Sequence, residues 1–137
     1  MPKESGIGLT VTVDDSAGTG QAITNDVTNL SWTMASADQD VTGQNKGGHE
    51  RIHLLADFSV TLNGVFNDAA NLSFQVFKNY RTLAASQVGR TTAIAHSGQT
   101  LTVEVLYTDF SFNRGNDGSL TWTAPGALAD GGVPAWA

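Results

Sequence analysis

Two histidines that stand four residues apart are the strongest chemical signal in the sequence. His49-Glu50-Arg51-Ile52-His53 matches H-E-x-x-H, the pattern in which zinc peptidases hold a metal ion. That chemistry requires a helix, because positions i and i+4 then share one face, both imidazoles reach one Zn²⁺ and the glutamate activates its bound water. Whether these residues can bind zinc therefore depends on the backbone conformation of the segment.

The residues around the motif predict an extended backbone. Gly47 and Gly48 precede it, and an alternation of apolar and polar residues begins at Ile52. On a strand, with about 3.3 Å per residue, the two histidines would lie about 13 Å apart, beyond the reach of one metal ion. Ala56 also occupies the position where the metzincin pattern has glycine. We therefore reject the zinc peptidase and predict no catalytic residue, no metal site and no cofactor.

Composition excludes several other kinds of chemistry. The chain has 137 residues, 40% hydrophobic and 15% charged, which is too apolar for a disordered tail and too poor in charge for a coiled coil. The absence of cysteine excludes disulfides and thiolate chemistry. A net charge of −6 argues against a stable complex with nucleic acid. We find neither a signal peptide nor an apolar run of about 20 residues, and so expect a cytosolic product without a membrane anchor.

The elements that carry these residues are mostly strands, because apolar and polar residues alternate with a period of two. Between residues 52 and 62 every even position is apolar and every odd one except Leu55 is polar, which predicts one buried and one polar face. Phe110 and Phe112 continue an earlier alternation on the opposite parity, which predicts a bulge between Leu106 and Asp109. The other segments that alternate are 7–13, 101–107 and 120–124, with weaker candidates at 27–34 and 88–95.

Turns and one helix complete the predicted elements. Apolar residues from 67 to 83 follow helical spacing after a capping Asn67-Asp68 pair, which predicts a helix packed outside the β layers. Residues typical of turns separate the strands and predict antiparallel hairpins at 14–18, 96–99 and 113–118.

The longest segment without periodicity runs from 35 to 51 and is polar, a type of loop that often carries function in a compact domain. No internal repeat or linker divides the chain. We therefore predict a single mainly β domain at 1–137. It is an antiparallel β-sandwich or barrel with one flanking α-helix at about 67–83 and a long polar loop at about 35–51.

The three tryptophans leave a second interpretation open. Trp32, Trp122 and Trp136 could stack on sugars if they were aligned on an exposed face, as in a carbohydrate-binding or capsid-decorating β-sandwich. Trp122 shares its parity with Leu120, which favours the core, and Trp136 is next to last, which favours a clip for the C-terminal segment. Trp32 is ambiguous.

Five short segments occur in an order that points to a known family: ITNDVTN at 23–29, DVTG at 40–43, LADFSVTLNG at 55–64 entered by Glu50-Arg51, VFNDAA at 65–70 and LADGGVPAW at 128–136. Together they span roughly residues 20 to 137. This order resembles the tail tube (major tail) protein of long-tailed, siphovirus-like bacteriophages, and among these the major tail proteins of actinobacterial siphophages.

The resemblance implies a structural virion protein without enzymatic activity. In that family the β-sandwich assembles into hexameric rings, which stack into a hollow tube through which DNA passes transiently and without sequence specificity. The implied partners are further copies of the chain, a tape-measure protein, and tail terminator and tail-tip proteins. The implied location is the virion tail, after assembly in the host cytoplasm.

The resemblance also assigns two groups of residues. The polar loop would reach the neighbouring ring, and its ring-stacking candidates are Asp38, Asp40, Gln44, Lys46, His49, Glu50 and Arg51. Polar strand positions would line the lumen, namely Asp57, Ser59, Thr61, Asn63, Thr102, Glu104 and Thr108. Hydroxyl, amide and acidic side chains suit a surface past which DNA slides. Any antiparallel strand shows a polar face to water, however, so the alternation by itself favours neither reading.

Overall fold

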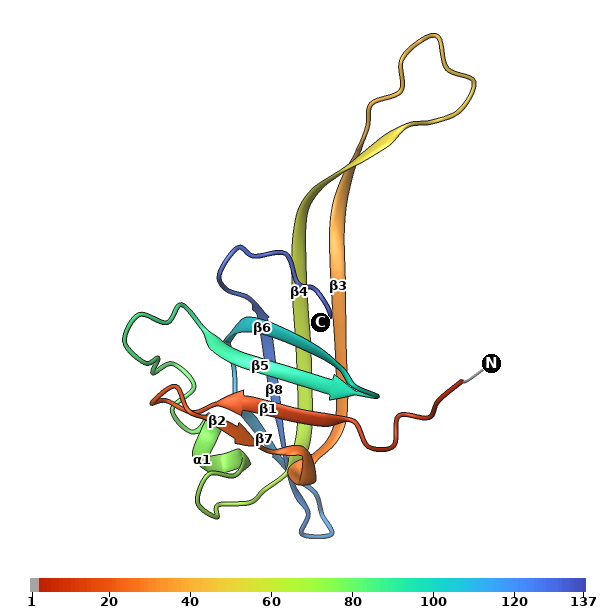
Figure 1. Ribbon diagram of the computed structural model, residues 1–137. Coiled ribbons are helices and arrows are strands. Elements are labelled where there is room, and N and C mark those ends of the chain that lie inside the picture. The colour runs from red at the N-terminus through yellow and green to blue at the C-terminus, as the bar shows by residue number, and fades with distance from the viewer. Residues whose placement is uncertain (1–2) are drawn as a thin grey trace.

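The computed structural model describes residues 3–137 and is mainly antiparallel β-sheet (Figure 1). Its strands are β1 (Thr10–Asp14), β2 (Gly20–Ala22), β3 (Val27–Asp40), β4 (Arg51–Val65), β5 (Arg90–His96), β6 (Gln99–Tyr107), β7 (Ser111–Arg114) and β8 (Leu120–Leu128). A 3₁₀ turn, η1 (Thr24–Asp26), precedes β3, and one short helix, α1 (Ser73–Phe77), follows β4. No helix among the described residues is long and apolar enough to cross a membrane.

All strands belong to one sheet with the order β2-β1-β5-β6-β8-β4-β3, and β7 pairs with β8 beside this path. The sheet folds at β6, because residues 99–105 of this strand pair with β5 whereas residues 105–107 pair with β8. Strands β1 and β5 therefore cross over β8, β4 and β3 as a second layer (Figure 1). The predicted mainly β, antiparallel class is confirmed, but the sheet does not close into a barrel.

The core lies between the two layers and follows the predicted alternation. Each layer contributes every second residue of its strands, so that the intervening residues remain on the outer faces. The buried apolar residues include Val11 and Val13 of β1, Phe58, Val60 and Leu62 of β4, Leu101, Val103 and Val105 of β6, and Trp122 and Ala124 of β8. Hairpins at 96–99 and 113–118 are confirmed; at the first of them Ser97 and Gly98 both adopt positive φ angles.

The predicted helix at 67–83 is wrong in its length, because α1 spans only Ser73–Phe77. Arg90, which is 1% exposed, explains where the helix stops. Its guanidinium donates to the backbone carbonyls of Val76, Asn79 and Thr82, and the first of these would accept an N–H bond in a longer helix. Burial lowers the pKa of Arg90, while Asp15 and neighbouring groups oppose this effect.

The predicted bulge between Leu106 and Asp109 is also absent. β6 ends at Tyr107, the Thr108 N–H donates to the Pro125 carbonyl, and the chain then turns into a separate strand, β7, on the edge of β8. The change of parity at Phe110 and Phe112 therefore reflects a strand break rather than an extra residue in one strand.

The largest correction concerns residues 35–57, which we call the arm. β3 continues to Asp40 and β4 begins at Arg51, so the connecting loop covers only 41–50 instead of 35–51. β8 pairs with β4 only from Ser59 onward, so the arm is a two-stranded ribbon that projects beyond the body (Figure 1). Ile52 and Leu54, predicted to be buried, are therefore 48% and 47% exposed, because no second layer covers them.

Candidate assembly surfaces

The H-E-x-x-H residues lie in the arm and do not form a helix; the backbone is extended from Ile52 onward, as predicted. β4 begins at Arg51, so His53 is on a strand and His49 is in the loop before it. His49 Nδ1 lies 2.8 Å from Asp40 Oδ2, whereas His53 Nδ1 lies 3.1 Å from Ser36 Oγ. The two imidazoles thus engage different partners. Among residues 3–137 no group of three or more metal-ligating side chains is positioned to hold an ion.

The tip of the arm is held by a compact set of hydrogen bonds. Thr42 donates its backbone N–H to Asp40 Oδ1 over 3.0 Å, and its Oγ1 accepts the Glu50 N–H over 2.8 Å. The Thr42 hydroxyl and N–H, together with His49, lower the pKa of Asp40, although slight desolvation opposes them. Lys46 Nζ lies 3.3 Å from Glu50 Oε1. A loop of this kind presents a defined shape to a partner.

The structure brings most of the ring-stacking candidates together on this tip. Arg51 Nε lies 3.8 Å from Asp38 Oδ2 across the ribbon, with more than half of each side chain exposed. Together with the Asp40–His49 and Lys46–Glu50 pairs this accounts for six of the seven candidates. Gln44 is exposed in the same loop. Surface ion pairs of this type contribute little to stability, so they are available to an incoming surface.

The arm also carries several exposed apolar residues, some of which the sequence pattern assigned to the core. Leu54 and Leu55 both oppose Ala37 in a β-bulge, since Ser36 pairs with Ala56 and Asp38 pairs with His53. The bulge explains why Leu55 breaks the alternation and is 86% exposed. The other exposed apolar residues on or beside the arm are Met34, Val41 and Ile52. The bulge also shifts the parity of β4, so that Ile52, opposite Gln39, lies on the side of Asp57 rather than on the side of Phe58. The single apolar face predicted for residues 52–62 is therefore wrong beyond the bulge.

Four of the seven lumen candidates share one surface, which we call the hydroxyl face. Across the sheet, Thr33 and Ser59 are joined by a 2.7 Å hydrogen bond, and the Thr123 hydroxyl donates to Asn63 Oδ1 over 2.8 Å. Asp57 is its one charged member, and β3, β8 and residues 52–65 of β4 contain no Lys or Arg. The face comprises Asn29, Ser31 and Thr33 of β3, Asp57, Ser59, Thr61 and Asn63 of β4, and Thr121 and Thr123 of β8.

The other three lumen candidates lie elsewhere. Thr102 and Glu104 belong to β6 in the second layer, on its outer side. Glu104 is half-buried under the C-terminal segment; the Thr91 hydroxyl donates to its carboxylate, and the Ala129 N–H donates to its backbone oxygen over 3.0 Å. Thr108 lies in the turn after β6. A single surface therefore does not include all seven residues.

Two free strand edges flank the hydroxyl face. In the described part of the chain, β3 pairs only with β4, and β7 pairs only with β8. The body portion of this layer, β7-β8-β4-β3, thus ends in unpaired backbone groups on both sides. The edge of β6 that faces away from β5 is not free, because the C-terminal segment covers part of it. Thr100 and Ala137 exchange backbone hydrogen bonds, and Trp136 forms a β-bridge with Leu101. Soluble monomers protect free edges, whereas assemblies use them.

The tryptophans do not form a flat exposed platform. Trp122 is 1% exposed and packs against Phe77 with ring centroids 5.3 Å apart, as its parity predicted. Trp136 holds the C-terminal segment to the body, as predicted, and its ring is tilted 54° to that of Trp32 at 6.1 Å. Tilted neighbouring rings do not offer one plane on which a sugar can stack.

Comparison with known proteins identifies solved structures that contain chains of the same fold. No protein-family model matches the chain, and no curated protein matches it. A solved structure of the virion of a native gene transfer agent (GTA) particle contains a chain with 16% identity and a TM-score of 0.71, over 98% of this chain and 99% of that one. A chain in the tail of an empty GTA particle, refined with C6 helical symmetry, gives 17% identity, the same TM-score and the same coverage.

The chain has the fold of these GTA subunits. A chain of the phage p2 baseplate is also similar, with 11% identity and a TM-score of 0.50 over 88% of this chain. This chain spans only 44% of the baseplate chain, whereas it matches the GTA subunits from end to end. At these identities the likeness is one of fold.

Proposed function

We propose that this protein is a structural tail tube subunit of a phage-like particle. Copies assemble into hexameric rings, the rings stack into a tube, and the tube conducts DNA during ejection. The observation that carries this proposal is the fold shared, over 98% of the chain, with subunits of a GTA tail and virion. The chain works without catalysis, and it resides in the virion tail after assembly in the host cytoplasm.

The hydroxyl face supports the role of a lumen wall. DNA carries one negative charge per phosphate, so lysine or arginine side chains would bind it and slow its passage. A face of hydroxyl and amide groups with Asp57 as its one carboxylate offers hydration without ionic attachment. Free edges on both sides of this face let copies of the layer join into a closed wall.

The arm supports the role of a contact between successive rings. It projects along the direction of β3 and β4, and it ends in the ordered tip with exposed apolar residues beside it (Figure 1). Leu55 and the other exposed apolar side chains of the arm could pack against a neighbouring ring, which would bury them. A tape-measure protein within the lumen, and terminator and tip proteins at the two ends, complete the proposed set of partners.

Negative-stain electron microscopy of the concentrated protein tests the proposal. We expect rings or hollow tubes, whereas a strict monomer at high concentration would refute it. A variant that lacks residues 41–50, with a short turn in their place, is expected to keep the circular dichroism of the body and to form at most single rings. Tubes of normal length from this variant would remove the stacking role from the loop.

A charge substitution tests the lumen assignment. Asp57→Lys places a cation on the proposed DNA path, and we expect tubes to form while DNA release from assembled particles slows. Asp130→Lys, an exposed change near the C-terminus, is the matched control for net charge. Equal release rates for the two variants would mean that Asp57 does not face the lumen.

A further inference from the structure

We propose that an apolar groove at the root of the arm holds the opposite end of the body of a second copy, so that copies join end to end along the direction of β3 and β4. This inference rests on the proposed tail tube function, and it adds a contact between successive rings that does not involve the tip of the arm. The two surfaces of this contact lie at the two ends of the layer that contains β3, β4 and β8 (Figure 1).

The first surface, which we call the root groove, lies where the arm leaves the body. It has a volume of about 310 Å³, and most of its accessible lining is apolar. Two of its polar side chains, Ser36 and His53, are joined to each other by a hydrogen bond of 3.1 Å. The apolar lining includes Met34, Leu54 and Ala56 of the ribbon and Val133 and Pro134 of the C-terminal segment.

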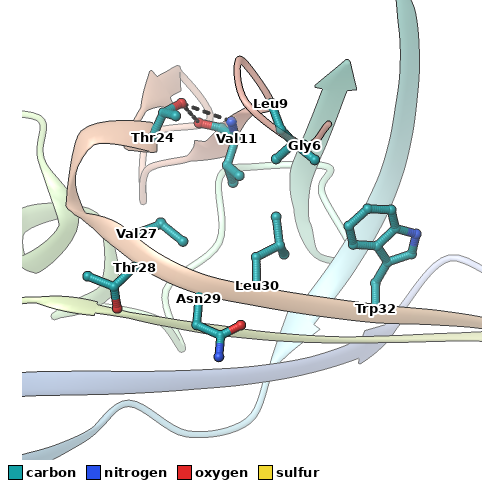
Figure 2. Close-up of a pocket in the computed structure, with 9 residues that line it drawn as sticks. All are labelled: Gly6, Leu9, Val11, Thr24, Val27, Thr28, Asn29, Leu30 and Trp32. Carbon is teal, nitrogen blue, oxygen red and sulfur yellow. Dashed lines mark hydrogen bonds between the residues drawn. The ribbon is translucent and has the colours of Figure 1, made fainter. Parts of the chain in front are cut away.

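The root groove lies on the side of β3 that faces the second layer. Figure 2 shows this side nearer the start of the strand, where Leu30 and Trp32 point toward Leu9 and Asn29 points to the opposite side. Met34 follows Trp32 by two residues and therefore shares its side. The strands of the second layer cross β3 and β4 before this point, which leaves the groove open (Figure 1).

The second surface, which we call the foot ridge, lies at the other end of the same layer. Leu120 is the first residue of β8, and its carbonyl accepts the Phe66 N–H just after β4 over 3.2 Å. Phe112 pairs with Trp122, and Leu120 is two residues from Trp122, so both lie on the side of this buried ring. The ridge consists of Phe66, Phe112 and Leu120, and the centroids of its two rings are 6.1 Å apart.

The two surfaces therefore lie on the same side of one layer. They are about 35 Å apart along it, because β4 runs from the groove at Leu54 to its end at Val65 with about 3.3 Å per residue. A second copy that is displaced along the strands brings its foot ridge over the root groove of the first. Since the two surfaces are unlike, the contact is heterologous and repeats without closing on itself, as growth of a tube requires. A contact between two root grooves, or between two foot ridges, would instead give a twofold dimer.

The exposed apolar area determines when this contact forms. In the groove Met34, Leu54 and Val133 are 41%, 47% and 76% exposed, and the three ridge side chains are 36–43% exposed. Together these exposed parts amount to roughly 400 Å² of apolar surface. A stable interface buries about 1,200 Å² or more in total, so one contact is too small to hold two free copies together. Six contacts bury roughly 2,400 Å² of apolar surface, so rings stack only after they have closed.

Engineered cysteines test the contact directly. The native chain has no cysteine, and the two surfaces of one copy are too far apart to react with each other, so every disulfide joins two copies. Four double variants combine Leu54→Cys or Val133→Cys with Phe112→Cys or Leu120→Cys. We expect mild oxidation of assembled tubes to link copies into covalent strings longer than a dimer with at least one combination.

Matched controls separate a specific contact from chance collision. Each single cysteine variant is expected to stop at a dimer. Leu120→Cys combined with Val88→Cys, at an exposed position in the loop before β5, is expected to give no strings.

Val133→Ser tests the groove without disturbing the core, because most of this side chain is exposed. From its exposed fraction we expect the equilibrium constant of one contact to fall about seven- to fiftyfold, and the six contacts between two rings to multiply this effect. Single rings and the circular dichroism of the body should stay as in the native chain, while tubes become short or absent. Leu120→Ser, on the ridge, should give the same result, whereas Val88→Ser should stack as the native chain does.

The outcomes distinguish this inference from the function on which it rests. Tubes of native length from Val133→Ser and Leu120→Ser would overturn the contact and leave the tail tube proposal intact, and so would double cysteine variants that give no strings or stop at a dimer. A native chain that forms neither rings nor tubes would refute both. Strings, together with serine variants whose rings fail to stack, would support both.

Discussion

Leu55 offers the sharpest test of how the arm works. It lies in the bulge of β4, is 86% exposed, and makes no contribution to the core between the layers. Leu55→Ser should therefore change the free energy of unfolding of the monomer by less than about 0.5 kcal/mol. If the arm packs against the next ring, however, the same substitution removes apolar burial from every contact between rings.

The magnitude follows from the exposed fraction. Complete burial of a leucine side chain contributes about 1.5–3 kcal/mol, so burying the exposed part of Leu55 contributes about 1.3–2.6 kcal/mol for each contact. This corresponds to a factor of about ten to eighty in the equilibrium constant of a single contact. In the proposed hexamer six contacts act together, so the loss between two rings reaches about 8–15 kcal/mol, enough to stop stacking.

Two measurements separate folding from assembly. Thermal unfolding by circular dichroism reports on the monomer, and pelleting together with tube length by electron microscopy reports on stacking. Val88→Ser, at an exposed site in the loop before β5, is the control for a lost surface hydrophobe. Leu55→Ser tubes of native length at the native critical concentration would refute the reasoning.

Three further predictions concern the body and the tip. Gly64→Ala should lower stability in urea by at least about 1–3 kcal/mol, because a Cβ there would clash with the Asp26 backbone carbonyl and lie 2.5 Å from the Trp122 ring; unchanged stability would mean that both the carbonyl and the ring can shift. Arg90→Met should cost about 3 kcal/mol or more in the same assay, because it leaves several buried carbonyls without a donor; a smaller loss would show that water replaces the guanidinium. Because the pKa of Asp40 is lowered, its hydrogen bonds should persist at neutral pH. They should be lost as the pH falls below 3.8, the ordinary value of an aspartate, and through the lowered pKa. Amide exchange of Thr42 measures this, and protection of the Thr42 amide that stays the same across this pH range would contradict the prediction.

The backbone conformation of the H-E-x-x-H segment could be predicted from the sequence because the necessary information is local. Glycines before the motif and alternation after Ile52 both disfavour a helix, and β4 begins at Arg51. The extent of the arm could not be predicted in this way. A two-stranded ribbon with water on both faces does not require alternation, so residues 35–40 look like a loop although they pair with β4.

The candidate surfaces show the same difference between what local sequence information predicts and what it does not. Ser59, Thr61 and Asn63 were placed correctly on one polar face, because side chains two apart on a strand share a face. Thr102 and Glu104 have the same pattern but belong to the other layer, and the contribution of Thr123 to the hydroxyl face was missed. Alternation assigns a residue to one of two sides of its own strand, and it contains no information on which strand lies next to it.

By itself, then, the sequence determined the strands, most of the turns and the parity of the core, because these depend on neighbours within a few residues and on which side of a strand meets water. Only the tertiary structure decided that β8 lies between β4 and β6, that the arm extends beyond the body because β8 pairs with β4 only from Ser59 onward, and that β3 and β7 remain as free edges. Strand order and register arise from contacts between residues far apart in the chain. The surfaces that we propose for assembly are consequences of that order.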